Sequence, residues 1–241
     1  MQKHTHQRIL RWVLAPLLLV TTASAWALSF TPIEMDFTPS GRGTTQIYRI
    51  ENTNAETAAV EISIKNRKMQ LNGEDQLSDA DDDFSIFPAQ VVLQPGQTQT
   101  VRVQYTGPAS LTSEKAYRLI AEQLPIDIGQ GPQNGGRMRL LVKYVASVYI
   151  VPAGARPKLK LAETKLTTEE GKAWLELLIH NEGSSRKILK DAQVQIAGQK
   201  IQGEELKGLE GENLLAQTQR WFRIPAPKGV TSAQNVQFTV P

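Results

Sequence analysis

The sequence predicts an all-β protein made of two antiparallel β-sandwich domains. Runs of five to eight residues that alternate or are β-branched recur along the chain, and clusters of Gly, Pro, Asn and Asp separate them. After the first 27 residues no helical periodicity extends over eleven residues. A length of 241 residues is sufficient for two sandwiches of about 100 residues each.

Residues 1–27 have the three parts of a secretory signal peptide. A basic start precedes the apolar run from Trp12 to Val20, and Ala25-Trp26-Ala27 fits the A-x-A cleavage pattern. We expect cleavage after Ala27, with Ala23-Ser24-Ala25 as an alternative site two residues earlier. The apolar run spans only about 14 Å as a helix, against a bilayer core of about 30 Å. The mature chain is therefore expected in the periplasm, with no insertion into the membrane.

The basic excess of the sequence belongs to this leader. The whole chain has 27 Lys and Arg and 24 Asp and Glu, and Lys3, Arg8 and Arg11 lie in the leader. What remains is 24 basic and 24 acidic residues, which gives no electrostatic argument for a nucleic-acid partner.

The predicted strands begin after the leader and continue to the C-terminus. Turn signals such as Asn72-Gly73, Pro95-Gly96 and Gly107-Pro108 separate them. The main predicted strands are 46–51, 59–65, 90–93, 98–105, 117–124, 138–151, 173–180 and 193–196.

A domain boundary is expected where Pro152, Gly154 and Pro157 interrupt the longest strand-like run. This divides the chain into a signal peptide at 1–27, a first domain at 28–153 and a second domain at 154–241.

The composition favours binding over catalysis. There is no Cys, and His180 is the only His outside the leader, so cysteine nucleophiles and the usual zinc sites are excluded. The run from Asp79 to Asp83 lacks the Gly and Glu of an EF-hand loop, and the glycines at 129–136 do not have dinucleotide-binding spacing. We therefore expect no enzyme activity, no cofactor and no metal site.

The segment 138–151 is the most informative part of the sequence. Its even positions are all apolar, whereas the odd positions include Arg139, Lys143 and Ser147. It is either a central strand whose apolar row fills the core, or an edge strand that adds to the sheet of a partner. Periodicity alone leaves both interpretations open.

The chain resembles the PapD-like periplasmic chaperones of chaperone–usher pilus systems, and their archaic, non-classical branch more than the classical one. The resemblance extends over nearly the whole chain after the leader. The fragments that carry it are Ile50-Glu51-Asn52, 94–103, 117–125, Leu141-Val142-Lys143-Tyr144, 148–152, Leu214-Leu215-Ala216 and Gln219-Arg220-Trp221-Phe222.

This resemblance implies two immunoglobulin-like sandwiches in an L or boomerang arrangement, and no catalysis. It implies that the first domain lends its last strand to a pilin or fimbrial subunit and delivers the subunit to an outer-membrane usher. On this mapping the client-binding strand carries Met138, Leu140, Val142 and Tyr144.

The resemblance also implies basic residues that hold the C-terminal carboxylate of the subunit. The classical anchors, an Arg and a Lys, correspond here to Glu34 and Ser147, so the classical pair is absent. The archaic pattern of a basic residue before a Tyr fits Lys143, which is the first candidate, with Arg102 and Arg118 as further candidates.

Three alternatives accompany this interpretation. The first alternative is a structural or adhesive component of a surface fibre. Its donor strand would have to be the segment 28–33, which contains Pro32, and proline cannot donate a ladder hydrogen bond. A carboxylate-only hydrolase is a second alternative. An exposed apolar strand also allows a self-capping dimer of the free chaperone.

Overall fold

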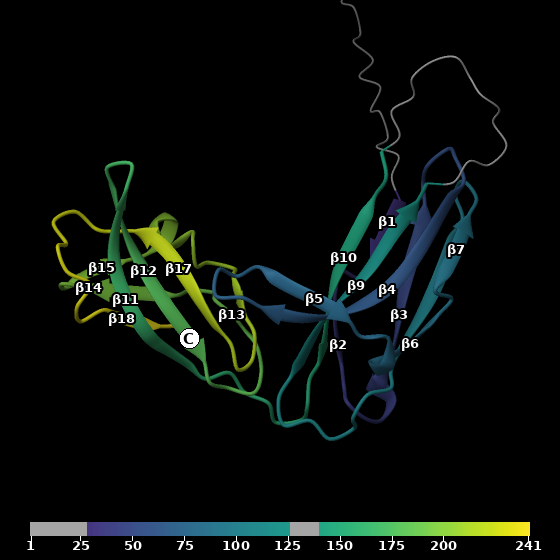
Figure 1. Ribbon diagram of the computed structural model, residues 1–241, viewed down its shortest axis with the longest axis horizontal. Helices are drawn as coiled ribbons and strands as arrows, with labels where there is room; N and C mark the ends of the chain where they lie inside the picture. Colours follow the sequence, from purple (N-terminus) through teal and green to yellow (C-terminus); the bar gives the residue numbers. More distant parts are fainter. Residues whose placement is uncertain (1–27, 126–139) are drawn as a thin grey trace, which may run out of the picture.

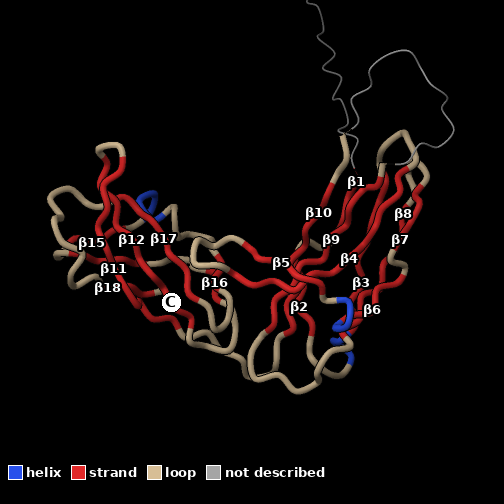
Figure 2. The backbone as a smooth tube through the Cα atoms, viewed as in Figure 1, coloured by secondary structure: helices blue, strands red, loops and turns tan. Residues whose placement is uncertain are grey.

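The computed structural model describes residues 28–125 and 140–241, and these form two β-sandwiches joined at an angle (Figure 1). Figure 2 shows that strands dominate both halves. The helical segments of the described residues are short 3₁₀ turns. These turns are η1 (Arg42–Thr44), η2 (Asp81–Asp83) and η3 (Gly203–Leu206). Each sandwich has its own cluster of buried hydrophobic residues. The structure thus has the all-β, two-domain architecture that the sequence predicts.

The first domain has two sheets. The first sheet has the order β1-β3-β8-β6, and the second has the order β2-β10-β9-β4-β5, with β7 paired to β4. The strands are β1 (Leu28–Thr31), β2 (Glu34–Phe37), β3 (Thr45–Asn52), β4 (Ala58–Met69), β5 (Asp75–Asp79), β6 (Phe84–Phe87), β7 (Gln90–Leu93), β8 (Thr98–Tyr105), β9 (Lys115–Leu124) and β10 (Lys143–Ile150).

The chain changes sheets within its first ten described residues. Strand β1 pairs antiparallel with β3 in the first sheet, whereas β2 pairs parallel with β10 in the second. Because β2 has only four residues, it covers only the part of β10 from Ser147 to Ile150. This short pairing leaves the rest of that side of β10 without a neighbouring strand among the described residues.

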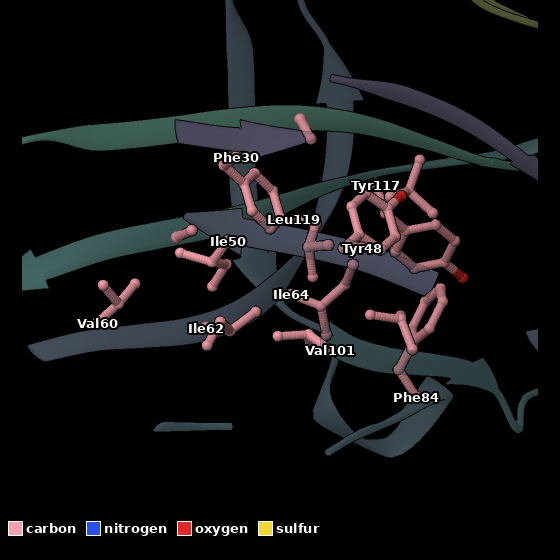
Figure 3. Close-up of a cluster of buried hydrophobic side chains, with 14 of the residues drawn as sticks. Phe30, Tyr48, Ile50, Val60, Ile62, Ile64, Phe84, Val101, Tyr117 and Leu119 are labelled. Carbon is pink, nitrogen blue, oxygen red and sulfur yellow. The ribbon is translucent and has the colours of Figure 1, made fainter. Parts of the chain in front are cut away.

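The first core forms because alternate residues of facing strands point inward. In β4, Val60, Ile62 and Ile64 are buried, while Glu61 between them is exposed. Aromatic rings fill the rest: Phe30 stacks on Tyr48 with centroids 5.3 Å apart, and Phe84 meets Tyr117 edge-on at 4.9 Å (Figure 3).

The second domain consists of three small sheets around the second core. Their orders are β11-β12-β17, β13-β16 and β15-β14-β18. The strands are β11 (Leu159–Glu169), β12 (Lys172–Asn181), β13 (Lys187–Ile188), β14 (Gln193–Ile196), β15 (Gln199–Ile201), β16 (Asn213–Leu214), β17 (Gln219–Pro225) and β18 (Gln237–Thr239).

The β4–β5 hairpin of the first domain lies against the second domain (Figure 1). At its tip the Trp221 N–H of β17 donates to the Leu71 carbonyl at 2.7 Å, and the Met69 side chain is buried in the second core. Tyr149 of β10 is also part of the second core. Two side chains of the first domain, Met69 and Tyr149, are therefore buried in the core of the second domain.

One predicted strand is shorter in the structure. The sequence predicts a single strand over 138–151, but regular pairing begins at Lys143 and ends at Ile150. Leu140 to Val142 lie outside the strand, although the Gln123 N–H still donates to the Val142 carbonyl at 2.9 Å. Met138 and Arg139, like Ala27 and the rest of the leader, lie outside the described residues.

Candidate functional site at the open edge of β10

Strand β10 has one fully paired side and one partly paired side. Strand β9 pairs with all of its residues, from Lys143 opposite Glu122 to Ile150 opposite Lys115. On the other side, β2 begins only at Ser147. We call the unpaired side of Lys143–Ala146 the open edge.

The backbone groups at the open edge belong to the odd-numbered residues. The Ser147 N–H donates to the Ile33 carbonyl at 2.7 Å, and the Val151 N–H donates to the Phe37 carbonyl at 2.8 Å, both on the β2 side. Because successive residues of a strand direct their backbone groups to opposite sides, Lys143 and Val145 also face this side. Their N–H and C=O groups are available to another strand.

The even-numbered side chains change surroundings along the strand. Ala146, Val148 and Ile150 are buried in the first core. Tyr144 packs against that core, and its hydroxyl donates to the Leu28 carbonyl. Beyond it Val142 is half-buried, and Leu140 is 85% exposed. The same apolar row therefore fills the core at one end and leaves it at the other.

Lys143 lies at the outer end of the open edge. Its Nζ is 2.9 Å from Glu122 Oε2 on β9, and both side chains are about half exposed. An ion pair this exposed is weak, so Lys143 remains available to a ligand.

Arg118 lies at the inner end of the open edge, on β9 directly opposite Ser147. One of its terminal nitrogens donates to Ser147 Oγ at 2.5 Å. Its Nε and its other terminal nitrogen both donate to Asp75 Oδ2, at 2.8 and 2.6 Å. The open edge therefore ends beside a guanidinium group.

A second arginine shares the same carboxylate. Arg67 Nε donates to Asp75 Oδ1 at 2.6 Å, and its Nη1 donates to the Tyr149 hydroxyl at 3.2 Å. Arg67, Asp75 and Arg118, which we call the arginine cluster, are mostly buried, with side-chain exposures of 7%, 19% and 19%. The cluster holds two positive charges against one negative charge.

The charges in the cluster determine the ionisation of Asp75. Burial alone would raise the pKa of this carboxyl, but the hydrogen bonds and charges of Arg67 and Arg118 outweigh burial and lower the pKa below its ordinary value. Asp75 is therefore ionised at neutral pH. Sequence reasoning missed Arg67 and Asp75, because their contact with Arg118 depends on the registers of β4, β5 and β9.

The structure does not bring Arg102 to this site. Arg102 lies on β8 in the opposite sheet, with Ile47 and Phe87 as its cross-strand neighbours. Its guanidinium donates to the Gln104 side chain at 2.6 Å on the exposed outer face. Among the three basic candidates, Lys143 lies on β10 and Arg118 lies opposite Ser147 of β10, whereas Arg102 is remote from this strand.

The positions of the absent classical anchor pair are neighbours in the structure. Ser147 and Glu34 lie opposite one another in the parallel pairing of β10 with β2. Glu34 accepts a hydrogen bond from Arg186 of the second domain at 3.2 Å, so it faces the junction between the domains. Arg118 is thus the basic group that contacts Ser147, and Arg186 is the one that contacts Glu34.

Arg186 joins the second domain to the base of the first. Its guanidinium donates to Glu114 at 3.0 Å and to Asp36 at 2.8 Å, and it lies 3.7 Å from the centroid of the Tyr149 ring. Asn213 of the second domain lies 2.9 Å from the Tyr149 hydroxyl, the group that also accepts from Arg67. The inner end of the open edge is thus at the junction of the two domains.

Two further findings concern residues 28–125 and 140–241. They contain no cluster of His, Asp or Glu side chains suited to a metal ion, and no helix long and apolar enough to cross a membrane. His180 lies on β12, with its Nδ1 3.9 Å from Glu182 Oε1.

Residues 38–156 match the family described as pili and flagellar-assembly chaperone, PapD N-terminal domain. Together with the two-domain fold, this match identifies the chain as a member of the PapD-like pilus-assembly chaperone family. That family is periplasmic and has no enzymatic activity.

The chain is similar to several solved structures. The alignment with the class 5 fimbriae chaperone CfaA includes 89% of this chain and 100% of CfaA, with 17% sequence identity and a TM-score of 0.58. For a chain of the CsuC–CsuE chaperone–tip adhesion subunit complex of Acinetobacter baumannii, the coverages are 88% and 97%, the identity 14% and the TM-score 0.58. For the E. coli chaperone DraB, the alignment includes 90% of this chain and 98% of DraB, with 14% identity and a TM-score of 0.53. These likenesses establish the fold. Comparison with curated proteins gave no match.

Proposed function

We propose that this protein is a periplasmic chaperone that binds pilin or fimbrial subunits by donating β10 and delivers them to an outer-membrane usher. The observation that carries the proposal is the open edge. It has free backbone groups, continues outward into exposed apolar side chains and ends at an arginine cluster.

The physical basis is the completion of an incomplete subunit sandwich. A subunit strand aligned with the open edge pairs with the backbone groups of Lys143 and Val145. Leu140 and Val142 then fill the groove of the subunit, with Met138 in the same alternating row. Burying Leu140, now 85% exposed, contributes about 1.5–3 kcal/mol before ordering costs.

The geometry favours Arg118 over Lys143 as the anchor for the terminal carboxylate. A subunit strand running toward the domain junction must stop at Ser147, where the Ile33 carbonyl already takes the N–H. Lys143 lies four residues earlier, about 13 Å away along the strand. Of these two cations, Arg118, which donates to Ser147 Oγ, therefore lies at the end of such a strand, and Lys143 contacts the subunit closer to its outer end.

We further propose that residues 1–27 direct export and are removed after Ala27. The mature protein then consists of domains 28–153 and 154–241. The described strands disfavour a fibre component that lacks its own last strand, because β18 near the C-terminus pairs with β14.

The experiment is co-expression of the chaperone in a periplasm with a fimbrial subunit encoded beside its gene, followed by pull-down of the mature protein. We expect the wild-type chaperone to yield a one-to-one complex and Leu140→Asp to abolish it, because a charge cannot enter an apolar groove. Arg118→Met should weaken the complex more than Lys143→Ala does.

The matched control is Val92→Asp, because Val92 is 58% exposed on β7, away from the open edge. It should leave the complex intact. An unchanged complex with Leu140→Asp would refute the strand assignment, and equal complexes with Arg118→Met and wild type would refute the anchor.

A further inference from the structure

The arginine cluster at the end of the open edge already contains a carboxylate. Asp75 accepts one hydrogen bond from Arg67 and two from Arg118, at 2.6 to 2.8 Å. Charge-assisted pairs of this geometry are among the strong hydrogen bonds of proteins. A side chain of the chaperone therefore makes the contacts that a terminal carboxylate of a subunit would need.

The tip of the hairpin that carries Asp75 is held by the second domain. The tip accepts the Trp221 N–H through Leu71, and Gly73 packs so closely on Arg220 that a Cβ there would lie 2.2 Å from the Arg220 Nε. Next to the turn, Met69, paired with Asp75, is buried in the second core. Asp75 is thus held in place by both domains and cannot leave the cluster without moving the hairpin.

The net charge of the arginine cluster favours an incoming carboxylate, whereas the hydrogen bonds that Arg118 already makes oppose its binding. The cluster has one uncompensated positive charge, and its other hydrogen-bonding partners, Ser147 and Tyr149, are neutral hydroxyls. This favours a second anion. However, the Nε and Nη2 of Arg118, which form one bidentate side of the guanidinium, both donate to Asp75, and Nη1 donates to Ser147. A second carboxylate that uses this bidentate side therefore has to displace Asp75.

We propose that Asp75 is an internal competitor for the terminal carboxylate of the subunit. It keeps Arg118 partly occupied, so that the anchor binds a carboxylate weakly and releases it readily. The proposal rests on the proposed function, since it names the element that regulates the carboxylate site of the chaperone.

The first test uses acetate as a probe and needs no subunit. Tm is compared in acetate and in chloride at equal ionic strength for wild type and Asp75→Asn. The Asn side chain keeps the shape of Asp75 but has no negative charge, so acetate can bind to the arginines. Acetate should therefore raise the Tm of Asp75→Asn by about 2 °C or more and leave the wild-type Tm unchanged. An equal effect of acetate on both proteins would overturn the proposal.

Two variants control this test. Asp79→Asn makes the same change on the same strand at the Lys65 ion pair, and it should behave as wild type. Asp75→Asn combined with Arg118→Met should lose the acetate effect. If the double variant keeps the effect, acetate binds elsewhere and the proposal is wrong.

The second test separates this proposal from the proposed function. The probe is a synthetic strand of alternating Thr and Val, preceded by two Lys, with a free or an amidated C-terminus. We expect wild type to prefer the free acid slightly and Asp75→Asn to increase that preference about tenfold, the value of one charge-assisted hydrogen bond. If both proteins bind the peptides with equal preference, strand binding stands and the role of Asp75 is refuted. If neither binds any peptide while the acetate effect is present, strand donation fails and the competition by Asp75 stands.

Discussion

Two asparagines close equivalent corners of the two domains. Asn52 ends β3, and its Nδ2 donates to the Glu56 and Leu93 carbonyls at 2.9 Å each, while its Oδ1 accepts the Asn54 N–H at 3.0 Å. Asn181 ends β12 and bonds its own surrounding loops in the same way. Both side chains are fully buried. A buried amide with satisfied donors and acceptor stabilises loops whose backbone groups have no strand partner.

The first prediction concerns Asn52. Replacing it with Ala should lower the free energy of unfolding by about 3 kcal/mol, because several buried or partly buried backbone groups lose their partner. Asn66→Ala, at an exposed position of β4, should change it by less than about 0.5 kcal/mol. Urea unfolding followed by far-UV circular dichroism measures both, and equal losses would contradict the assigned role of Asn52.

The residues of the arginine cluster differ in how far the sequence could predict them. Arg118 stands out, as Lys143 outside the cluster does, because it lies in a strand-like run that carries the resemblance. Arg67 and Asp75 do not, since they are 8 positions apart and meet Arg118 only through a hairpin and a neighbouring strand. Charged residues on a strand give no local signal of their partner, because that partner depends on register.

At the scale of elements, the predicted strands agree best where one face is buried. The predicted ranges 90–93 and 98–105 coincide with β7 and β8, whose burial alternates. Strands β5 and β11 were not predicted. Almost all of β5 is exposed, so it has no alternation that predicts a strand. In β11, Leu159, Leu161 and Leu166 pack against the second core, but none is fully buried, and a register shift between Leu161 and Glu163 interrupts the alternation. These strands form because a tertiary neighbour, β12 or β4, provides the ladder.

The second prediction concerns the backbone of β10. Val145→Pro removes an N–H that faces the open edge, so the free protein should keep its stability while losing subunit binding. Val145→Ala, which keeps the N–H, should retain binding. The measurements are Tm for the free protein and pull-down for the complex.

A contrasting variant defines the direction of these groups. The Ala146 N–H faces β9, so Ala146→Pro should destabilise the free protein by about 2 kcal/mol or more. If Val145→Pro is as destabilising as Ala146→Pro, the assignment of backbone groups to the two sides of β10 is wrong.

At the scale of the whole molecule, a buried carboxylate contributes to the junction. The Glu114 side chain is 2% exposed and faces Arg186, Asp36 and Glu34 around the same guanidinium. Burial raises the pKa of Glu114, and nearby Asp36 adds to the rise, while Arg186 opposes it without cancelling it. Holding this group ionised therefore costs stability that Arg186 only partly offsets.

The third prediction follows from the sign of that shift. A carboxyl with a raised pKa binds its proton more tightly in the folded state, so folding loses stability as pH rises from the ordinary value of 4.5 through the folded-state pKa. The free energy of unfolding of Glu114→Gln should therefore improve relative to wild type over this window and stay parallel to it below pH 4.5. Urea unfolding at a series of pH values measures the difference. The exposed Glu205→Gln is the control, and a difference that moves the other way would contradict the prediction.

The sequence by itself determined the all-β class, the two sandwiches and the apolar row at the even positions of 138–151, because alternation, turn residues and composition are local properties. It also indicated binding rather than catalysis, since Cys is absent and one His remains outside the leader. Only the tertiary structure decided where β10 is open and which cation ends that edge. The limit of the open edge is set by four residues of β2, and the partners of Arg118 are set by the register of a hairpin held between two domains. Pairing between distant segments is a global property, so no local pattern encodes it.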